Sequence, residues 1–137
     1  MKVRDWTGIP ETPCHGDLTL ENILLTAGKS IAFIDCDESF ASSFWLDFGK
    51  LFQDLDGHWC IRALYGPEPA PARLLNAVQK LEQLGAQFRH LASELDPRLP
   101  FLLPQLSALG LYRAIPYARN ATSVSFVCDR IERLLET

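Results

Sequence analysis

A short stretch near the N-terminus holds polar residues of the types that phosphoryl transfer requires. The run His15-Gly16-Asp17 is followed by Asn22, and a further carboxylate, Asp35, comes directly after an apolar run. Moving a phosphoryl group from a nucleotide needs one carboxylate to orient and deprotonate the acceptor hydroxyl, together with ligands for Mg²⁺. Oxygen atoms are the ligands that this hard cation prefers. The residue types therefore predict phosphoryl-transfer chemistry.

The elements that must position these residues are predicted to form a β-hairpin. Residues 18–25 end in three apolar side chains, residues 27–29 read Ala-Gly-Lys and suit a tight reversal, and residues 31–34 are again apolar. This pattern predicts two short strands, with Asp35 at the exit of the second.

Helices are expected to form the rest of the chain. Between Ser43 and Leu55 the apolar residues recur at the spacing of an amphipathic helix, which we expect to pack against the hairpin. Similar patterns predict helices over residues 73–95, 102–117 and 123–135, the first closed by Asp96-Pro97 and the last capped by Asn120 or Thr122. The predicted fold class is α+β, mostly helical, with a small hairpin that carries the catalytic and metal-binding residues.

Composition narrows the class of protein. A chain of 137 residues with 47% hydrophobic content is the size of one domain with one core. Its 13 basic and 17 acidic residues give a net charge of -4 with no basic cluster, which argues against nucleic acid as a partner. The N-terminus lacks the apolar core of a signal peptide, and no run reaches the roughly 18 apolar residues of a membrane span. We therefore expect a cytoplasmic protein that is not bound to a membrane. The four cysteines form no C-x-x-C pair and are expected to be reduced thiols: Cys14, Cys36, Cys60 and Cys128.

The segment 15–22, HGDLTLEN, matches the pattern H-x-D-L-x-x-x-N of phosphotransferase catalytic loops, and the second Asp follows in the expected order. It resembles the aminoglycoside phosphotransferase and choline kinase superfamily, whose motif reads HGD with Asn five residues after the Asp. By this resemblance Asp17 is the catalytic base, and Asn22 and Asp35 bind Mg²⁺ and, through it, ATP. Asp37 has at most an auxiliary role, and Cys36 stands where relatives carry Phe.

Two further residues are expected to support the loop. The resemblance implies that Asp47, in the helix after the hairpin, braces the catalytic loop. For His15 we favour a structural role, with its side chain inside the loop and hydrogen-bonded to the backbone or to Asp35, over a role as ligand. Arg113 and Arg119 on a late helix either line the acceptor pocket or face solvent.

The resemblance also implies a division into lobes. Residues 1–13 are expected to be an extended lead-in, and residues 14–137 a protein-kinase-like C-terminal lobe, made of a catalytic and metal-binding unit over 14–40 and a helical body over 43–137. The N-terminal nucleotide lobe of the family has no counterpart before Cys14, so we expect it to be absent from the chain. A lobe without its partner exposes an apolar face, which predicts self-association or pairing with such a lobe.

The expected function is ATP- and Mg²⁺-dependent transfer of a phosphoryl group to a hydroxyl of a small polar molecule, such as an aminoglycoside, a sugar or an amino alcohol. The alternative is a kinase-derived binding or regulatory module without catalytic activity. Fold-level analogy does not identify the acceptor, because substrate choice depends on variable helices and loops.

Overall fold

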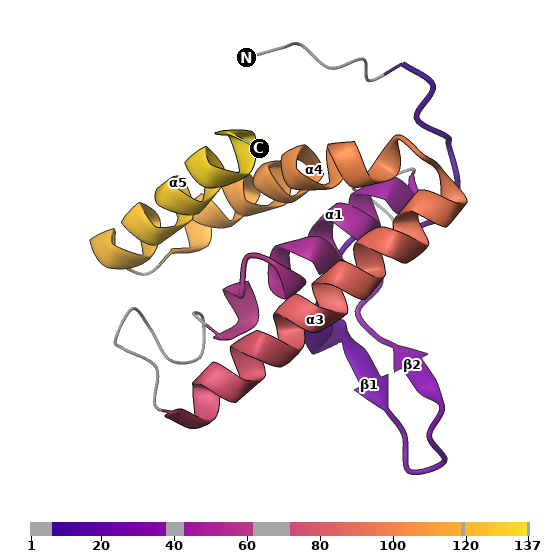
Figure 1. Ribbon diagram of the computed structural model, residues 1–137, viewed down its shortest axis with the longest axis horizontal. Coiled ribbons are helices and arrows are strands. Elements are labelled where there is room, and N and C mark those ends of the chain that lie inside the picture. The colour runs from indigo at the N-terminus through magenta and orange to yellow at the C-terminus, as the bar shows by residue number, and fades with distance from the viewer. Residues whose placement is uncertain (1–6, 38–42, 62–71, 119, 137) are drawn as a thin grey trace.

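The structure, a computed structural model, describes residues 7–37, 43–61, 72–118 and 120–136. It is mostly helical with one small antiparallel sheet, so the α+β class is confirmed (Figure 1). None of the helices within these ranges combines the length and the apolar character needed to cross a membrane. The elements are the strands β1 (Ile23–Leu25) and β2 (Ile31–Phe33), the helices α1 (Phe44–Leu55), α3 (Ala72–Leu95), α4 (Leu99–Ala114) and α5 (Ala121–Glu136), and the 3₁₀ turns η1 (Leu20–Asn22) and η2 (Ile115–Tyr117).

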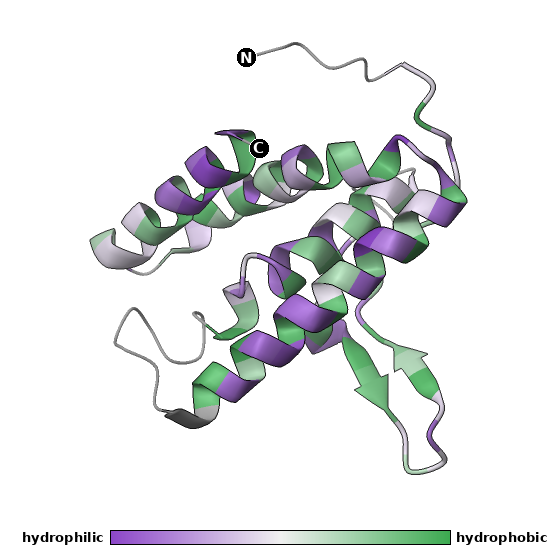
Figure 2. Cartoon of the chain, in the orientation of Figure 1, coloured by the Kyte–Doolittle hydropathy of each residue, from purple (hydrophilic) through white to green (hydrophobic). Residues whose placement is uncertain are grey.

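Helix α4 lies at the centre of the core, where it packs against α1, α3 and α5. Its apolar residues meet Trp45 and Phe52 of α1 and Val127 and Leu134 of α5, all of which are buried. Helices α1 and α4 approach very closely, because a β-carbon added at Gly49 would lie 2.4 Å from Leu106 Cβ. Hydrophilic residues appear instead on the visible faces of α3 and α5 (Figure 2). The close contact of α1 with α4 fixes the helix that carries much of the site.

The helices begin close to where the sequence predicts them. The Ser43 hydroxyl accepts a hydrogen bond from the Trp45 N–H, and Thr12 Oγ1 accepts one from the Phe44 N–H at 2.9 Å, so α1 has a capped start. Of the two cap candidates for α5, Asn120 fills the role, since its Oδ1 accepts from the Ser123 N–H at 2.8 Å. Helix α4 starts three residues before the predicted position because Pro100 suits a first turn.

The hairpin differs from the prediction in two respects. Its strands pair Ile23 with Phe33 and Leu25 with Ile31, but the residues before Ile23 form a 3₁₀ turn and not a strand. The strands also extend away from the helices, and Leu25 is 75% exposed (Figure 1). The expectation that α1 packs against the hairpin is therefore wrong. The apolar stripe of α1 packs against α4, and polar side chains of α1 contact the segment before β1.

Residues 7–13 form no helix or strand. Ile9 nevertheless packs against the helical core, and Arg98 Nη2 donates to the Gly8 carbonyl at 3.3 Å. These contacts lead the chain across the start of α1 and into the segment that holds His15 and Asp17.

Candidate active site

At His15 and Gly16 the loop before β1 is fixed to helix α1 by the carboxylate of Asp47. Asp47 Oδ2 accepts a hydrogen bond from the His15 N–H at 2.6 Å, and Oδ1 accepts one from the Gly16 N–H at 2.8 Å. Asp47 is only 5% exposed. Hydrogen bonds from N–H groups to an ionised carboxylate are among the stronger ones in proteins. The two bonds therefore determine where the loop lies relative to the helix.

The loop also crosses closely over the segment that follows β2. A β-carbon at Gly16 would lie 1.8 Å from the Asp37 carbonyl oxygen, and Gly16 has a φ of +84°, so only glycine fits. Next to this crossing, the Asp37 N–H donates to the His15 carbonyl at 2.8 Å. The crossing brings the Asp17 loop and the Asp35 segment together, as the hairpin prediction requires.

The His15 side chain connects the loop to the end of β2. Its Nε2 lies 2.8 Å from the Ile34 carbonyl oxygen, and its Nδ1 accepts from the Asp17 N–H at 3.4 Å. A nitrogen facing a carbonyl must carry the proton and one facing an N–H must not, so these contacts assign the neutral tautomer protonated on Nε2. Of the two partners expected for the His15 side chain, the backbone or Asp35, the structure shows the backbone.

The Asp17 carboxylate is in contact with two side chains. Its Oδ1 lies 2.8 Å from Lys50 Nζ, and its Oδ2 lies 3.4 Å from Asn22 Nδ2. Asn22 Nδ2 also donates to the Asp17 carbonyl at 2.9 Å. The side-chain nitrogen Nδ2 of Asn22 is thus turned toward Asp17, and the side-chain oxygen Oδ1 accepts no hydrogen bond within the described ranges.

Asn22 and Asp35 lie on hydrogen-bonded neighbouring segments. The Ile34 N–H donates to the Asn22 carbonyl at 3.1 Å, and Asp35 follows with a φ of +54°, an uncommon conformation for a residue other than glycine. Such backbone conformations concentrate at functional sites, where the surroundings hold them in place. The Asp35 side chain is exposed and forms no hydrogen bond or ion pair with other described residues.

This donor set fits a magnesium ion that binds together with phosphates. Within the described ranges no group of three or more His, Cys, Asp or Glu side chains could hold a metal ion by itself. Mg²⁺ does not require such a group, because it commonly binds through one or two carboxylates, several waters and substrate phosphates. An exposed Asp35 carboxylate and the side-chain oxygen Oδ1 of Asn22 are ligands of that kind.

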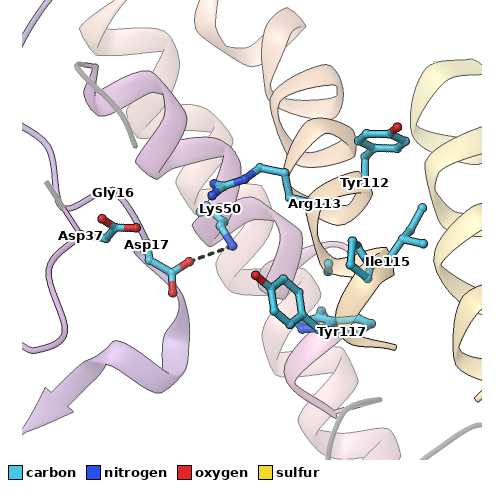
Figure 3. Close-up of a pocket in the computed structure, with 11 residues that line it drawn as sticks. Gly16, Asp17, Asp37, Lys50, Tyr112, Arg113, Ile115 and Tyr117 are labelled. Carbon is cyan, nitrogen blue, oxygen red and sulfur yellow. Dashed lines mark ion pairs between the residues drawn. The ribbon is translucent and has the colours of Figure 1, made fainter. Parts of the chain in front are cut away.

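A cavity of about 670 Å³ opens beside Asp17 (Figure 3). Asp17, Asp37 and Lys50 line one side, and Trp59, Arg113 and the η2 residues line the other. The Tyr117 hydroxyl and the Lys50 ammonium both point toward Asp17, whereas Tyr112 points away (Figure 3). This volume lies within the usual range for small-molecule sites. Arg113 is thus a lining residue, and Arg119 lies outside the described residues.

Comparison with known proteins gives one match. A sequence model of the Phosphotransferase enzyme family matches residues 4–79, which is more than half of the chain and includes the loop, the hairpin and α1. The chain belongs to this family. No curated protein and no solved structure matches it. The far wall of the cavity, formed by α4 and η2, lies beyond the matched range.

Sequence reasoning missed two residues of this phosphotransferase that contact the loop. Lys50 pairs with Asp17, and Asp54 accepts hydrogen bonds from the Leu20 N–H at 2.8 Å and the Cys60 N–H at 3.1 Å. A signal was present, because Asp47, Lys50 and Asp54 recur at helical spacing within a mostly apolar helix. They form one polar face of α1, and all three side chains are directed to the loop before β1.

Burial of Asp54 predicts a pH dependence of stability for this phosphotransferase. The side chain is 1% exposed, and burial raises the pKa of its carboxyl above the usual value, although the N–H groups of Leu20 and Cys60 oppose the shift. Since the folded pKa exceeds the unfolded one, Asp54 contributes most stability below the unfolded pKa and loses it as pH rises through the folded pKa. The excess in unfolding free energy of wild type over Asp54→Asn should therefore shrink as pH rises from about 4 to about 7. Urea unfolding of both proteins tests this, and a difference that widens over this range would contradict it.

Proposed function

We propose that this chain provides the acceptor-side and metal-binding part of an ATP- and Mg²⁺-dependent kinase that phosphorylates a hydroxyl of a small polar molecule. The proposal rests chiefly on one observation: the Asp17 carboxylate faces a cavity of about 670 Å³ while its loop is anchored to α1. Membership in the phosphotransferase family supports it. In this proposal residues 14–137 form a kinase-like C-terminal lobe, with the site over 14–40 and the helical body over 43–137.

Asp17 acts as the general base. Among the described residues its Oδ2 makes only the longer contact with Asn22, whereas Oδ1 is held by Lys50, so Oδ2 accepts the hydrogen bond from the acceptor hydroxyl. As the hydroxyl oxygen forms its bond to the γ-phosphorus, the bond from that phosphorus to the bridging oxygen breaks, and ADP leaves with the electron pair. The hydroxyl proton passes to Asp17.

Asn22 and Asp35 hold the metal in this proposal. Mg²⁺ bound by their oxygen atoms supplies positive charge that neutralises the phosphate oxygens. Asn22 has a second task, since its amide nitrogen fixes the Asp17 carbonyl at 2.9 Å. His15 and Asp47 keep the loop in the geometry that presents Asp17 to the cavity.

The acceptor occupies the cavity between Asp17 and η2. Trp59 and Tyr117 offer aromatic surfaces with polar tips, which suit a small molecule with both apolar faces and hydroxyl groups. A sugar, an amino alcohol or an aminoglycoside ring meets that description. Walls from α4 and η2 select among them, because these elements contact the acceptor and not the reacting phosphate.

Metal-dependent nucleotide binding tests the proposal. Wild type should bind ATP more tightly with Mg²⁺ than with EDTA, and Asp35→Asn should reduce the affinity in Mg²⁺ by about tenfold or more, because one of few protein ligands is weakened. Isothermal titration calorimetry measures both. Asp129→Asn is the matched control, since Asp129 is exposed on α5 away from this cavity.

Two results would count against this function. ATP affinity that is equal with Mg²⁺ and with EDTA would contradict the metal assignment. Metal-dependent ATP binding without transfer to any member of a panel of sugars, amino alcohols and aminoglycosides would favour the binding or regulatory module instead.

A further inference from the structure

Lys50 places a cation directly beside the proposed base. Its Nζ lies 2.8 Å from Asp17 Oδ1, and the Lys50 side chain is 17% exposed against 44% for Asp17. An exposed lysine–carboxylate pair contributes little to stability, so stability alone does not account for a lysine side chain that lies mostly buried at the wall of a cavity. The position of Lys50 needs a reason connected with what the cavity binds.

The packing of two helices sets this position. A β-carbon at Gly110 of α4 would lie 3.4 Å from Lys50 Cδ and 2.6 Å from Gln53 Oε1. A β-carbon at Gly110 would thus overlap Gln53 Oε1, whereas its distance from Lys50 Cδ is that of an ordinary contact, so the aliphatic stem of Lys50 lies against α4. This contact keeps the stem beside the cavity, where the ammonium pairs with Asp17.

A phosphoryl group that reaches Asp17 must also come within reach of Lys50. The acceptor hydroxyl lies about 3 Å from the base that takes its proton, and the reacting phosphorus lies about 3–3.5 Å from that hydroxyl. An ammonium has three N–H donors, and Asp17 Oδ1 occupies one of them. Within the described part of the chain Asp17 Oδ1 is the one group that pairs with this ammonium, which leaves two donors for oxygen atoms that carry negative charge during transfer.

We propose that Lys50 is a phosphate-binding residue of this site. Its ammonium holds Asp17 Oδ1 and donates at the same time to a non-bridging oxygen of the phosphoryl group being transferred. The inference rests on the proposed function, which brings that phosphoryl group to Asp17. Lys50 then contacts both the base and the group on which the base acts, and it adds a cation to the cavity besides Arg113 and the metal.

Binding of inorganic pyrophosphate without Mg²⁺ tests Lys50 separately from catalysis. In wild type, pyrophosphate should shift the ¹⁵N resonance of Lys50 Nζ, and Lys50→Met should weaken its binding by about fivefold or more. Asp17→Asn should strengthen binding by about fivefold, because it removes a like charge beside the anion. That gain should be lost when Lys50→Met is combined with Asp17→Asn. Lys80→Met, on an exposed part of α3, is the matched control.

The outcomes separate this inference from the proposed function. An unchanged Lys50 Nζ resonance in both wild type and Asp17→Asn, or equal pyrophosphate affinity in Lys50→Met and wild type, overturns the inference even if ATP is turned over. Pyrophosphate binding that depends on Lys50, in a protein that transfers no phosphoryl group from Mg·ATP, supports the phosphate site and rejects the proposed function.

Discussion

Asp17→Asn is expected to lower kcat for phosphoryl transfer by about 10²–10⁴-fold. The amide has the shape of the carboxylate but cannot accept the hydroxyl proton. The loop should keep its position, since Asp47 holds it through the backbone N–H groups of His15 and Gly16 and not through Asp17. Initial rates of ADP release with Mg·ATP and an acceptor measure the loss, and thermal unfolding of both proteins shows whether the fold is kept.

Asp37→Asn provides a control within the same cavity. Asp37 lines that cavity beside Asp17, so its substitution makes the same change of charge without removing the proposed base. We expect a smaller loss of kcat than in Asp17→Asn. If Asp17→Asn kept wild-type kcat while Asp37→Asn lost it, the base would be Asp37, and the role taken from the sequence motif would be wrong.

The sequence predicts elements best where a regular pattern has one physical cause. The apolar stripe from Phe44 to Leu55 predicts α1 because one face of that helix is buried. Helix α4 is located less well, since it is buried on most sides and its apolar residues follow no single face. Its last predicted turn, residues 115–117, is a 3₁₀ turn containing Pro116.

The sequence does not predict which partners the polar residues choose. The motif suggests Asp17, Asn22 and Asp35, but Lys50 meets Asp17 because Asp47 anchors the loop to the same face of α1. This contact joins residues far apart in the chain and depends on tertiary packing. The wrong expectation for the hairpin has a related cause, since periodicity shows that α1 has an apolar face without showing which element covers it.

Asp47→Ala is expected to have the largest effect on stability. It removes the acceptor of two N–H groups, those of His15 and Gly16, from a position where the carboxylate is 5% exposed. An unsatisfied buried donor costs about 1–3 kcal/mol, so the loss of the acceptor of two donors should lower the free energy of unfolding by roughly 2–6 kcal/mol. The whole free energy of unfolding of a natural domain is only about 5–15 kcal/mol. Urea unfolding measures the loss, and amide hydrogen exchange at Gly16 shows whether the loop has been released.

Asp47→Ala also shows whether the loop is held mainly by Asp47 or by its close crossing with the Asp37 segment. The His15 carbonyl still accepts from the Asp37 N–H at 2.8 Å when Asp47 is removed, so the close crossing at Gly16 can persist. If unfolding free energy and Gly16 exchange stayed at wild-type values, that crossing would hold the loop and Asp47 would be dispensable. We expect instead faster Gly16 exchange and a fall in kcat with Asp17 intact, because a base must be held in place to act. Asp129→Ala, which removes an exposed carboxylate on α5, should change neither the Gly16 exchange rate nor kcat.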